Sequence, residues 1–269
     1  MSLWSNNHLL TVLPTFAVLA IVAVLMRIWL INKPYEMRMI PIKIISIILI
    51  LIEIGKQAYS ISIGYNLYHI PLHFCSIFIY VLPLMAFYRG KHREKMASTA
   101  CAAMTSLFIG MLVMPNVIYS EERITAFFSD YLSFHTVFFH NIVIFALFLV
   151  ISLDLHKPSA SRGELLFVIA FGAGFVALAA TASYVLQTNF SNFLFTTVGV
   201  MQTLVEAVQL ALGEVTTKII YIASLAFLHI LLLVITNYVF LLICFGKEKL
   251  VGALNVIKLG SMAGEIHAD

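Results

Sequence analysis

Apolar stretches long enough to cross a membrane occupy most of this chain, with only short polar connectors between them. Of the 269 residues, 61% are hydrophobic and 11% are charged, whereas about one quarter of a soluble domain is charged. A spanning helix needs roughly 20 apolar residues. Seven stretches meet this condition: 9–31, 39–59, 69–88, 97–118, 132–153, 165–187 and 217–245. The sequence therefore predicts an all-α, polytopic membrane helix bundle, formed by a single integral membrane domain over residues 1–269.

One further apolar segment, 188–216, is less uniform than the seven predicted spans. Within it, Gln202, Glu206 and Gln209 recur at helical spacing and would share one face. We expect an interfacial or re-entrant helix here, or a span whose polar face turns into the bundle. An eighth span over 194–213 would place the basic C-terminus outside, so seven spans are favoured.

Positive charge predicts how the bundle lies in the membrane, because cytoplasmic loops carry an excess of Lys and Arg. All but three of the 16 Lys and Arg residues fall on one side of a seven-span topology, and the exceptions are Lys56, Arg123 and Lys218. This bias predicts an N-terminus outside and a C-terminus in the cytoplasm. Because the basic residues lie mostly in short loops, nothing resembles a nucleic-acid-binding patch, and no nucleic-acid partner is expected.

Cysteine and histidine residues lie inside the predicted spans. Segment 68–77 carries His69, His73 and Cys75, and segment 133–141 carries His135 and His140. Hydrocarbon discourages such residues, so their presence favours a functional role. The third and fifth spans both enter from outside, which places Cys75 and His140 roughly 9–12 Å below the outer boundary. Cysteine with histidine is the pairing that nucleophilic acyl chemistry needs.

Pro71 suits the first position of a helix, and a helix beginning there would place His73 in its first turn and Cys75 just after it. The positive end of the helix dipole would then favour a thiolate. Residues two apart on a regular helix point to different sides, so His73 is an unsuitable base for Cys75. His140 has a suitable depth on another span. The plainer interpretations are a cysteine that fills space and a histidine that bonds between helices.

Other polar residues are candidates for supporting roles, each with a plainer alternative. Glu53 and Lys56 lie one helical turn apart and can neutralise each other, or Lys56 can face a lipid phosphate. The polar stripe at Glu206 can line a cavity or face headgroups. Asn189 can fix an irregular segment or simply occupy a loop.

Two segments resemble a known family. Residues 70–77, Ile-Pro-Leu-His-Phe-Cys-Ser-Ile, resemble the Leu-Pro-Leu-His-Leu-Cys signature of bacterial YwaF-type integral membrane proteins. The aromatic run 131–142 resembles their second signature through His140, although Asn141 stands where glycine is expected. Residues 187–190 are similar to a later Thr-Asn-Tyr element, with Phe190 in place of tyrosine. YwaF-type proteins are similar to the eukaryotic transmembrane protein 164 group, which is regarded as a phospholipid acyltransferase with a cysteine acyl intermediate.

The resemblance implies a cysteine nucleophile and a histidine base, which fall on Cys75 and His140. It further implies an acyltransferase in a bacterial cell membrane, which acts on phospholipid or another acylated lipid during lipid remodelling. The expected partner is thus a membrane lipid substrate, and a donor already in the bilayer needs no soluble cofactor. The pair should share a cavity open to the outer leaflet. The residues expected to bind substrate or support the pair are His69, His73, His135, Asn141, Glu53, Lys56, Asn189 and Glu206.

Two alternatives stay open at this point. A lipid-binding or transport protein would hold a headgroup with the same polar cluster and break no bond. A metal-dependent membrane lipid hydrolase would use ligands from among His69, His73, His135 and His140, because histidines at i and i+4 can bind a metal. A zinc site needs three or four converging ligands, and no such set is evident in the sequence, so no metal is expected.

Overall fold

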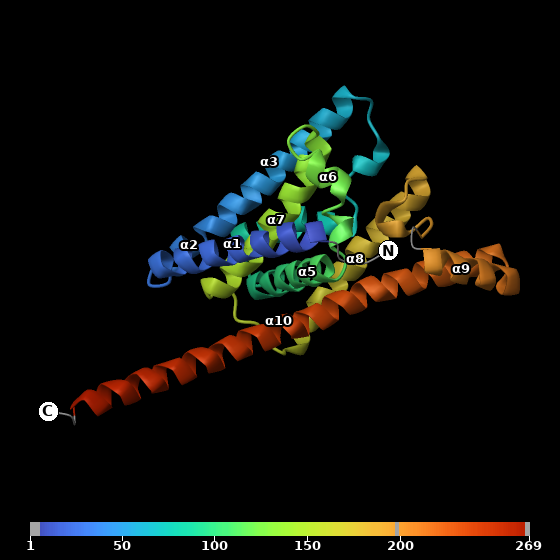
Figure 1. Ribbon diagram of the computed structural model, residues 1–269. Helices are drawn as coiled ribbons and strands as arrows, with labels where there is room; N and C mark the ends of the chain where they lie inside the picture. The colour runs from blue at the N-terminus through green and yellow to red at the C-terminus, as the bar shows by residue number, and fades with distance from the viewer. Residues whose placement is uncertain (1–5, 197–198, 267–269) are drawn as a thin grey trace.

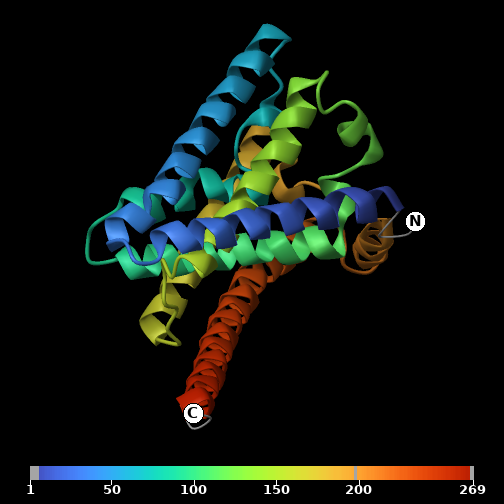
Figure 2. The same ribbon diagram turned by 60° about the vertical axis from the view of Figure 1, so that its left-hand side comes forward.

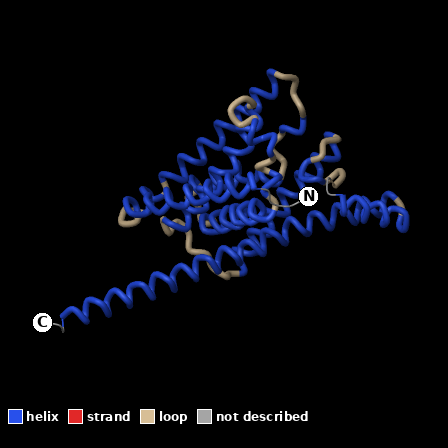
Figure 3. The backbone as a smooth tube through the Cα atoms, viewed as in Figure 1, coloured by secondary structure: helices blue, strands red, loops and turns tan. Residues whose placement is uncertain are grey.

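The computed structural model describes residues 6–196 and 199–266, and this part of the chain forms helices and loops without a strand (Figure 1, Figure 3). The predicted all-α class is confirmed. The long helices are α1 Asn6–Leu30, α3 Ile40–Ser62, α5 Arg93–Val113, α7 Tyr131–Ser152, α8 Arg162–Leu186, α9 Gly199–Leu212 and α10 Glu214–Ile266. The short ones are α2 Tyr35–Arg38, η1 Leu67–His69, η2 Phe74–Ile77, α4 Phe78–Phe87, η3 Pro115–Val117, α6 Glu121–Thr125 and η4 Phe190–Asn192.

Helix α5 lies at the centre of the bundle, where it packs against α4, α7, α8 and α10. Residues 97–106 of this helix are all buried, and most of them are Ala, Ser or Thr. Small side chains let helix backbones approach closely, which is the usual way that membrane helices pack. The approach is close enough for the Thr236 hydroxyl of α10 to donate to the Ala102 carbonyl, with a distance of 2.9 Å between the oxygens.

Five helices of the described chain are long and apolar enough to cross a membrane: α1, α5, α7, α8 and α10. More than half of the α5 and α7 spans is buried, whereas most of α1, α8 and α10 faces outward. The outward side chains are large and apolar, as at Ile21, Leu178 and Phe227. In water such a surface would aggregate, but in a bilayer it contacts lipid. These helices make the chain an integral membrane protein.

The third predicted span is shorter than expected. The sequence predicted a helix from Pro71, but residues 70–73 are not helical, and the helical run begins at Phe74 and continues through η2 and α4 to Phe87. The cause lies in the loop after α8, where the Ser191 hydroxyl donates to the Leu72 carbonyl and the Ser191 amide donates to His73 Nδ1. These bonds hold residues 72–73 in an extended form.

Helix α9 lies within segment 188–216, for which the sequence left three alternatives. Its 14 residues span about 21 Å, which is too short to cross the roughly 30 Å hydrocarbon core. Gly213, with φ of 80°, turns the chain from α9 into α10. Helix α10 then crosses the bundle and extends well beyond it (Figure 1, Figure 2).

Basic residues from three helices meet at the C-terminal end of α7. Asp154, just after the helix, forms ion pairs with Arg27 of α1 and Lys247 of α10. The Arg38 guanidinium donates to the Leu153 carbonyl at 2.7 Å. Cations at a helix C-terminus interact favourably with its dipole. Burial alone would raise the pKa of Asp154, but hydrogen bonds from Lys247 and Arg27 lower it, so the carboxylate stays charged.

Candidate functional site

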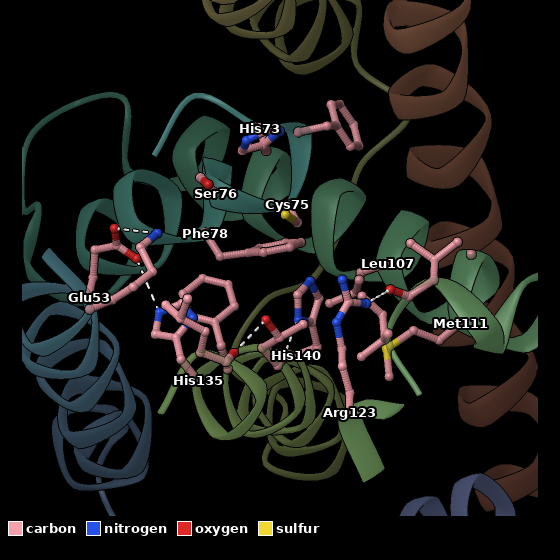
Figure 4. Close-up of a pocket in the computed structure, with 18 of the residues that line it drawn as sticks. Glu53, His73, Cys75, Ser76, Phe78, Leu107, Met111, Arg123, His135 and His140 are labelled. Atoms are coloured by element: carbon pink, nitrogen blue, oxygen red, sulfur yellow. Dashed lines mark hydrogen bonds and ion pairs between the residues drawn. The ribbon is translucent and has the colours of Figure 1, made fainter. Parts of the chain in front are cut away.

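A cavity of about 620 Å³ lies between α3, the segment 68–78, α5 and α7 (Figure 4). Its volume is within the range of ordinary small-molecule sites. Part of the wall is apolar, with Phe74, Phe78, Leu107, Met111, Met114, Leu132, Phe139 and Leu232. The polar part comprises Glu53, Lys56, Tyr68, His69, His73, Cys75, Ser76, Ser106, Arg123, Ser133, His135, Thr136 and His140.

The structure brings together most of the residues that the sequence indicated. Glu53, Lys56, His69, His73, Cys75, His135 and His140 all line this one cavity, although they come from separate segments. Asn141, Asn189 and Glu206 are not among the lining residues. The depth argument from the sequence thus placed the two histidine-bearing segments on a shared site.

Cys75 lies at the start of a helical segment. It is the second residue of η2, which continues directly into α4. This position is nearer the helix N-terminus than the sequence predicted, because the helix begins at Phe74 rather than Pro71. Cys75 therefore lies in the first turn of this helical run. The other two cysteines, Cys101 and Cys244, do not line the cavity.

The hydrogen bonds of His73 prevent it from acting as a base. Its Nε2 lies 3.0 Å from the Tyr68 carbonyl, which can only accept, so Nε2 carries the proton. Its Nδ1 accepts from the Ser191 amide at 3.4 Å. Both nitrogens are therefore in use, and neither offers a free lone pair. The sequence argument excluded His73 by its helix face, and that reason is wrong because residue 73 is not helical.

His140 has the opposite arrangement. Its Nδ1 lies 2.5 Å from the Thr136 carbonyl, one helical turn back, so Nδ1 must be the donor. In the neutral ring the other nitrogen, Nε2, then carries a lone pair. Nε2 is buried and has no hydrogen-bond partner among the described residues. The nitrogen that could accept a proton is thus unpartnered, and the residue that carries it lines the cavity (Figure 4).

The aromatic ring of Phe78 lies between the Cys75 sulfur and the His140 ring in the view of Figure 4. Phe78 is only 1% exposed and packs against Phe139, with 6.5 Å between ring centroids. Consequently Cys75 and His140 share a cavity, but His140 Nε2 makes no hydrogen bond to the thiol or to any other described group. The two residues thus share a cavity, as expected, without a hydrogen bond between them.

Glu53 is surrounded by donors on the opposite wall. Its Oε1 accepts from Gln57 at 2.7 Å and pairs with the Lys56 ammonium at 2.7 Å, as the sequence spacing suggested. His135 Nε2 lies 3.2 Å from Glu53 Oε2, without the alignment of a hydrogen bond. A buried carboxylate is tolerated when it is paired in this way. The ion pair with Glu53 largely neutralises the positive charge of Lys56.

Gly55 explains how α3 comes so close to α7. A Cβ at this position would lie 2.3 Å from the Tyr131 hydroxyl oxygen, which is closer than atoms can approach. With no side chain there, the Tyr131 hydroxyl donates to the Ile52 carbonyl at 3.1 Å. This contact sets the spacing that places Glu53 beside His135.

The remaining supporting residues have other roles. Asn189 organises the loop after α8, because its Oδ1 accepts from the amides of Leu194 and Phe195. That loop also carries Ser191, whose amide donates to His73 Nδ1. Asn189 therefore supports the position of residues 72–73, which directly precede the helical run with Cys75. Asn141 accepts from the Tyr119 hydroxyl. Exposed on α9, Glu206 lies away from the cavity.

The histidines of the cavity are held by other protein groups rather than gathered around one point. His69 Nδ1 is 2.6 Å from the Ser60 hydroxyl, while His73 and His140 bond to the backbone as described. Among the described residues there is no group of three or more His, Cys, Asp or Glu side chains that could hold a metal ion.

Arg123 and Phe78 are cavity residues that the sequence reasoning did not select. Arg123 lies in α6, directly before α7, and its guanidinium donates to the Val117 carbonyl. One signal was available for Arg123: it is one of three basic residues on the side with little positive charge. No sequence signal distinguishes Phe78 from the other 20 phenylalanines.

Comparison with known proteins identifies the family. No curated protein and no solved structure matches the chain. The TMEM164 family matches it over residues 3–237, which include every cavity residue. This agrees with the resemblance to the transmembrane protein 164 group that the two sequence segments indicated. The chain belongs to the TMEM164 family.

Proposed function

We propose that this protein is a membrane acyltransferase that acts on phospholipid, with Cys75 as nucleophile and His140 as general base. The observation that supports the proposal is the unpartnered Nε2 of His140, a residue that lines the same cavity as Cys75. Acyl transfer requires a nucleophile and an oriented base that can come together during the reaction. Here the Thr136 carbonyl is the orienting group.

The first half of the reaction transfers the acyl group to the enzyme. His140 Nε2 takes the thiol proton as Cys75 Sγ attacks the ester carbonyl of the donor lipid. The tetrahedral intermediate collapses, the carbon–oxygen ester bond breaks, and the leaving lipid hydroxyl receives the proton from the imidazolium. The products are a Cys75 thioester and a lysolipid. In the view of Figure 4 the Phe78 ring lies between the two groups, so the proposal includes a rotation of this side chain when the substrate enters.

The second half restores the thiol. The hydroxyl of an acceptor lipid gives its proton to His140 Nε2 while its oxygen attacks the thioester carbonyl. The carbon–sulfur bond breaks, and the proton returns to Cys75. No redox change occurs and no soluble cofactor is needed. The apolar wall around Leu107, Met111 and Leu232 offers a place for the acyl chain.

The test is detection of the thioester. Purified full-length protein is incubated with phospholipid that carries a radiolabelled acyl chain, then denatured and treated with neutral hydroxylamine. We expect a labelled protein band that hydroxylamine removes. Cys75→Ala should form no such adduct, whereas Cys244→Ala, which changes a cysteine outside the cavity, should form it as wild type does. A label that persists in Cys75→Ala would refute the mechanism.

A lipid-binding protein without chemistry is the second candidate, and the position of Phe78 is the observation that favours it. If the ring stays between Cys75 and His140 with lipid bound, no proton can pass directly between them. The same purified protein would then retain unchanged phospholipid through detergent extraction, and Cys75→Ala would bind it equally well without any adduct in either protein.

A further inference from the structure

We propose that Arg123 is the phosphate-binding residue of this cavity and that it holds the headgroup phosphodiester of the lipid substrate. The inference rests on the proposed function for the identity of the lipid as acyl substrate. The site itself is argued from the charges, hydrogen bonds and position of Arg123.

The charge balance of the cavity points to Arg123. Three charged side chains occur among its described lining residues: Glu53, Lys56 and Arg123. Glu53 and Lys56 form an ion pair with 2.7 Å between nitrogen and oxygen, so they largely neutralise each other. Arg123 makes no ion pair with any carboxylate of the described chain. One positive charge is left over, which suits a ligand group with one negative charge.

The hydrogen-bonding capacity of Arg123 is also largely unused. A guanidinium has five N–H donors in a planar fork that matches the oxygens of a phosphate. One of these donors is bonded to the Val117 carbonyl. That bond holds the side chain at the wall, and Figure 4 shows its guanidinium end beside His140. The other donors make no hydrogen bond within residues 6–196 and 199–266, so they can bind an anion.

The backbone of Arg123 lies outside the candidate spans, where a lipid headgroup would lie. Helix α6 lies outside the five candidate spans and just before α7 begins at Tyr131. Cys75 and His140 lie further along their segments, inside the apolar part of the chain. In a phospholipid the phosphate is likewise at the water side and the ester carbonyls are slightly deeper. A lipid with its phosphate on Arg123 would therefore present an ester toward the thiol.

The test measures binding without chemistry, in full-length protein that carries Cys75→Ala. Three radiolabelled ligands share one acyl chain: oleoyl lysophosphatidylcholine, monooleoylglycerol and oleate. We expect the lysophospholipid to bind about 10-fold more tightly than monooleoylglycerol, because a charge-assisted hydrogen bond is worth that factor or more. Adding Arg123→Gln should remove this preference, and Arg123→Lys should keep part of it. The matched control is Lys218→Gln, because Lys218 is exposed and paired with Glu214.

Two outcomes would overturn the proposal. In the first, Arg123→Gln does not change the preference for the phosphate-bearing ligand selectively. The variant either keeps that preference, or it weakens the binding of all three ligands equally and lowers the melting temperature, as loss of the bond to Val117 would do. In the second, only oleate binding depends on Arg123, which would make the site a carboxylate site. Failure of the acyl-enzyme proposal would give a different result. Wild-type protein would then form no thioester, but it would still prefer the phosphate-bearing ligand, and that preference would still depend on Arg123.

Discussion

The Thr136 carbonyl decides which nitrogen of His140 can act as a base. Because a carbonyl only accepts, it fixes the proton on Nδ1 and leaves the lone pair on Nε2. Nearby His73 has the same ring, but both of its nitrogens are bonded, one to Tyr68 and one to Ser191. Two histidines on one cavity thus differ in chemistry through their backbone partners alone.

Replacement of His140 should slow acyl transfer without preventing lipid binding. General base catalysis contributes roughly 10²–10⁴-fold, so His140→Ala should lower the initial rate of thioester formation by about that factor. The measurement is a time course of labelled protein under the conditions used for Cys75→Ala. His92→Ala is the control, because His92 stacks on Phe167 away from the cavity. Equal rates in His140→Ala and wild type would exclude His140 as the base.

The sequence could predict which residue types meet at the site, but not how each is held. Polar residues in apolar spans are costly, so Cys75, His135 and His140 stand out without any structure. The state of each histidine depends on partners that are distant in sequence, such as Ser191 for His73. Phe78 shows the same limit, because an aromatic residue in an apolar run is ordinary and only its place in the cavity gives it a role.

At the level of helices, the start of each element decides where its functional residues lie. The sequence favoured Pro71 as the first position of a helix, from local preference. The loop after α8 instead bonds Leu72 and His73 and delays the helix to Phe74. A contact between residues more than 100 positions apart thus overrides a local signal, and no single-sequence pattern contains it.

Asp130 fixes the start of α7, the helix that carries His135 and His140. Its side chain accepts from the Ser133 amide at 2.7 Å, which is an N-cap. Asp130→Ala should destabilise the protein by about 0.5–2 kcal/mol at neutral pH, whereas Asp130→Asn keeps an acceptor and should change little. The melting temperature in detergent measures both effects. An unchanged melting temperature in Asp130→Ala would show that the cap is dispensable.

The effect of Asp130 should also depend on pH. Hydrogen bonding to Ser133 lowers the pKa of Asp130 below its ordinary value of 3.8, because it favours the charged form. A lowered folded-state pKa gives stability that is present above pH 3.8 and is lost as the pH falls through the folded value. The difference in melting temperature between wild type and Asp130→Ala should therefore be constant near neutral pH and shrink in acid. A gap that widens in acid would contradict this assignment.

At the scale of the whole molecule, two opposite ends of the bundle have different characters. One end gathers Arg27, Arg38 and Lys247 around the C-terminus of α7. The cavity belongs to the other half of α7, where His135 and His140 lie and where Arg123 precedes the helix. Charge counting in the sequence predicted the basic end to be cytoplasmic, and this orientation stays a prediction.

The number of spans was harder to predict than the class. The sequence is 61% hydrophobic, and this composition alone predicts a helical membrane protein. Five helices meet the length and hydropathy of a span, whereas the third predicted span is shortened at its start by the irregular segment around Pro71. Hydropathy measures how apolar a stretch is but does not detect where the backbone leaves the helix. The seven-span topology stays a prediction.

Labelling from one side of the membrane tests the predicted orientation, and with it the leaflet that the cavity faces. Single cysteines are placed at two exposed positions, Ser129 before α7 and Ala160 before α8, in protein whose own cysteines are replaced by alanine. If positive charge sets the topology, a membrane-impermeant maleimide added to intact cells should label Ser129→Cys and leave Ala160→Cys unlabelled until the membrane is permeabilised. Because Ser129 lies between Arg123 and the start of α7, its labelling from outside would place the phosphate end of the cavity at the outer leaflet. The reverse labelling pattern would show that the bundle has the opposite orientation in the membrane. The proposed chemistry of Cys75 and His140 would be unaffected, but the substrate would lie in the cytoplasmic leaflet.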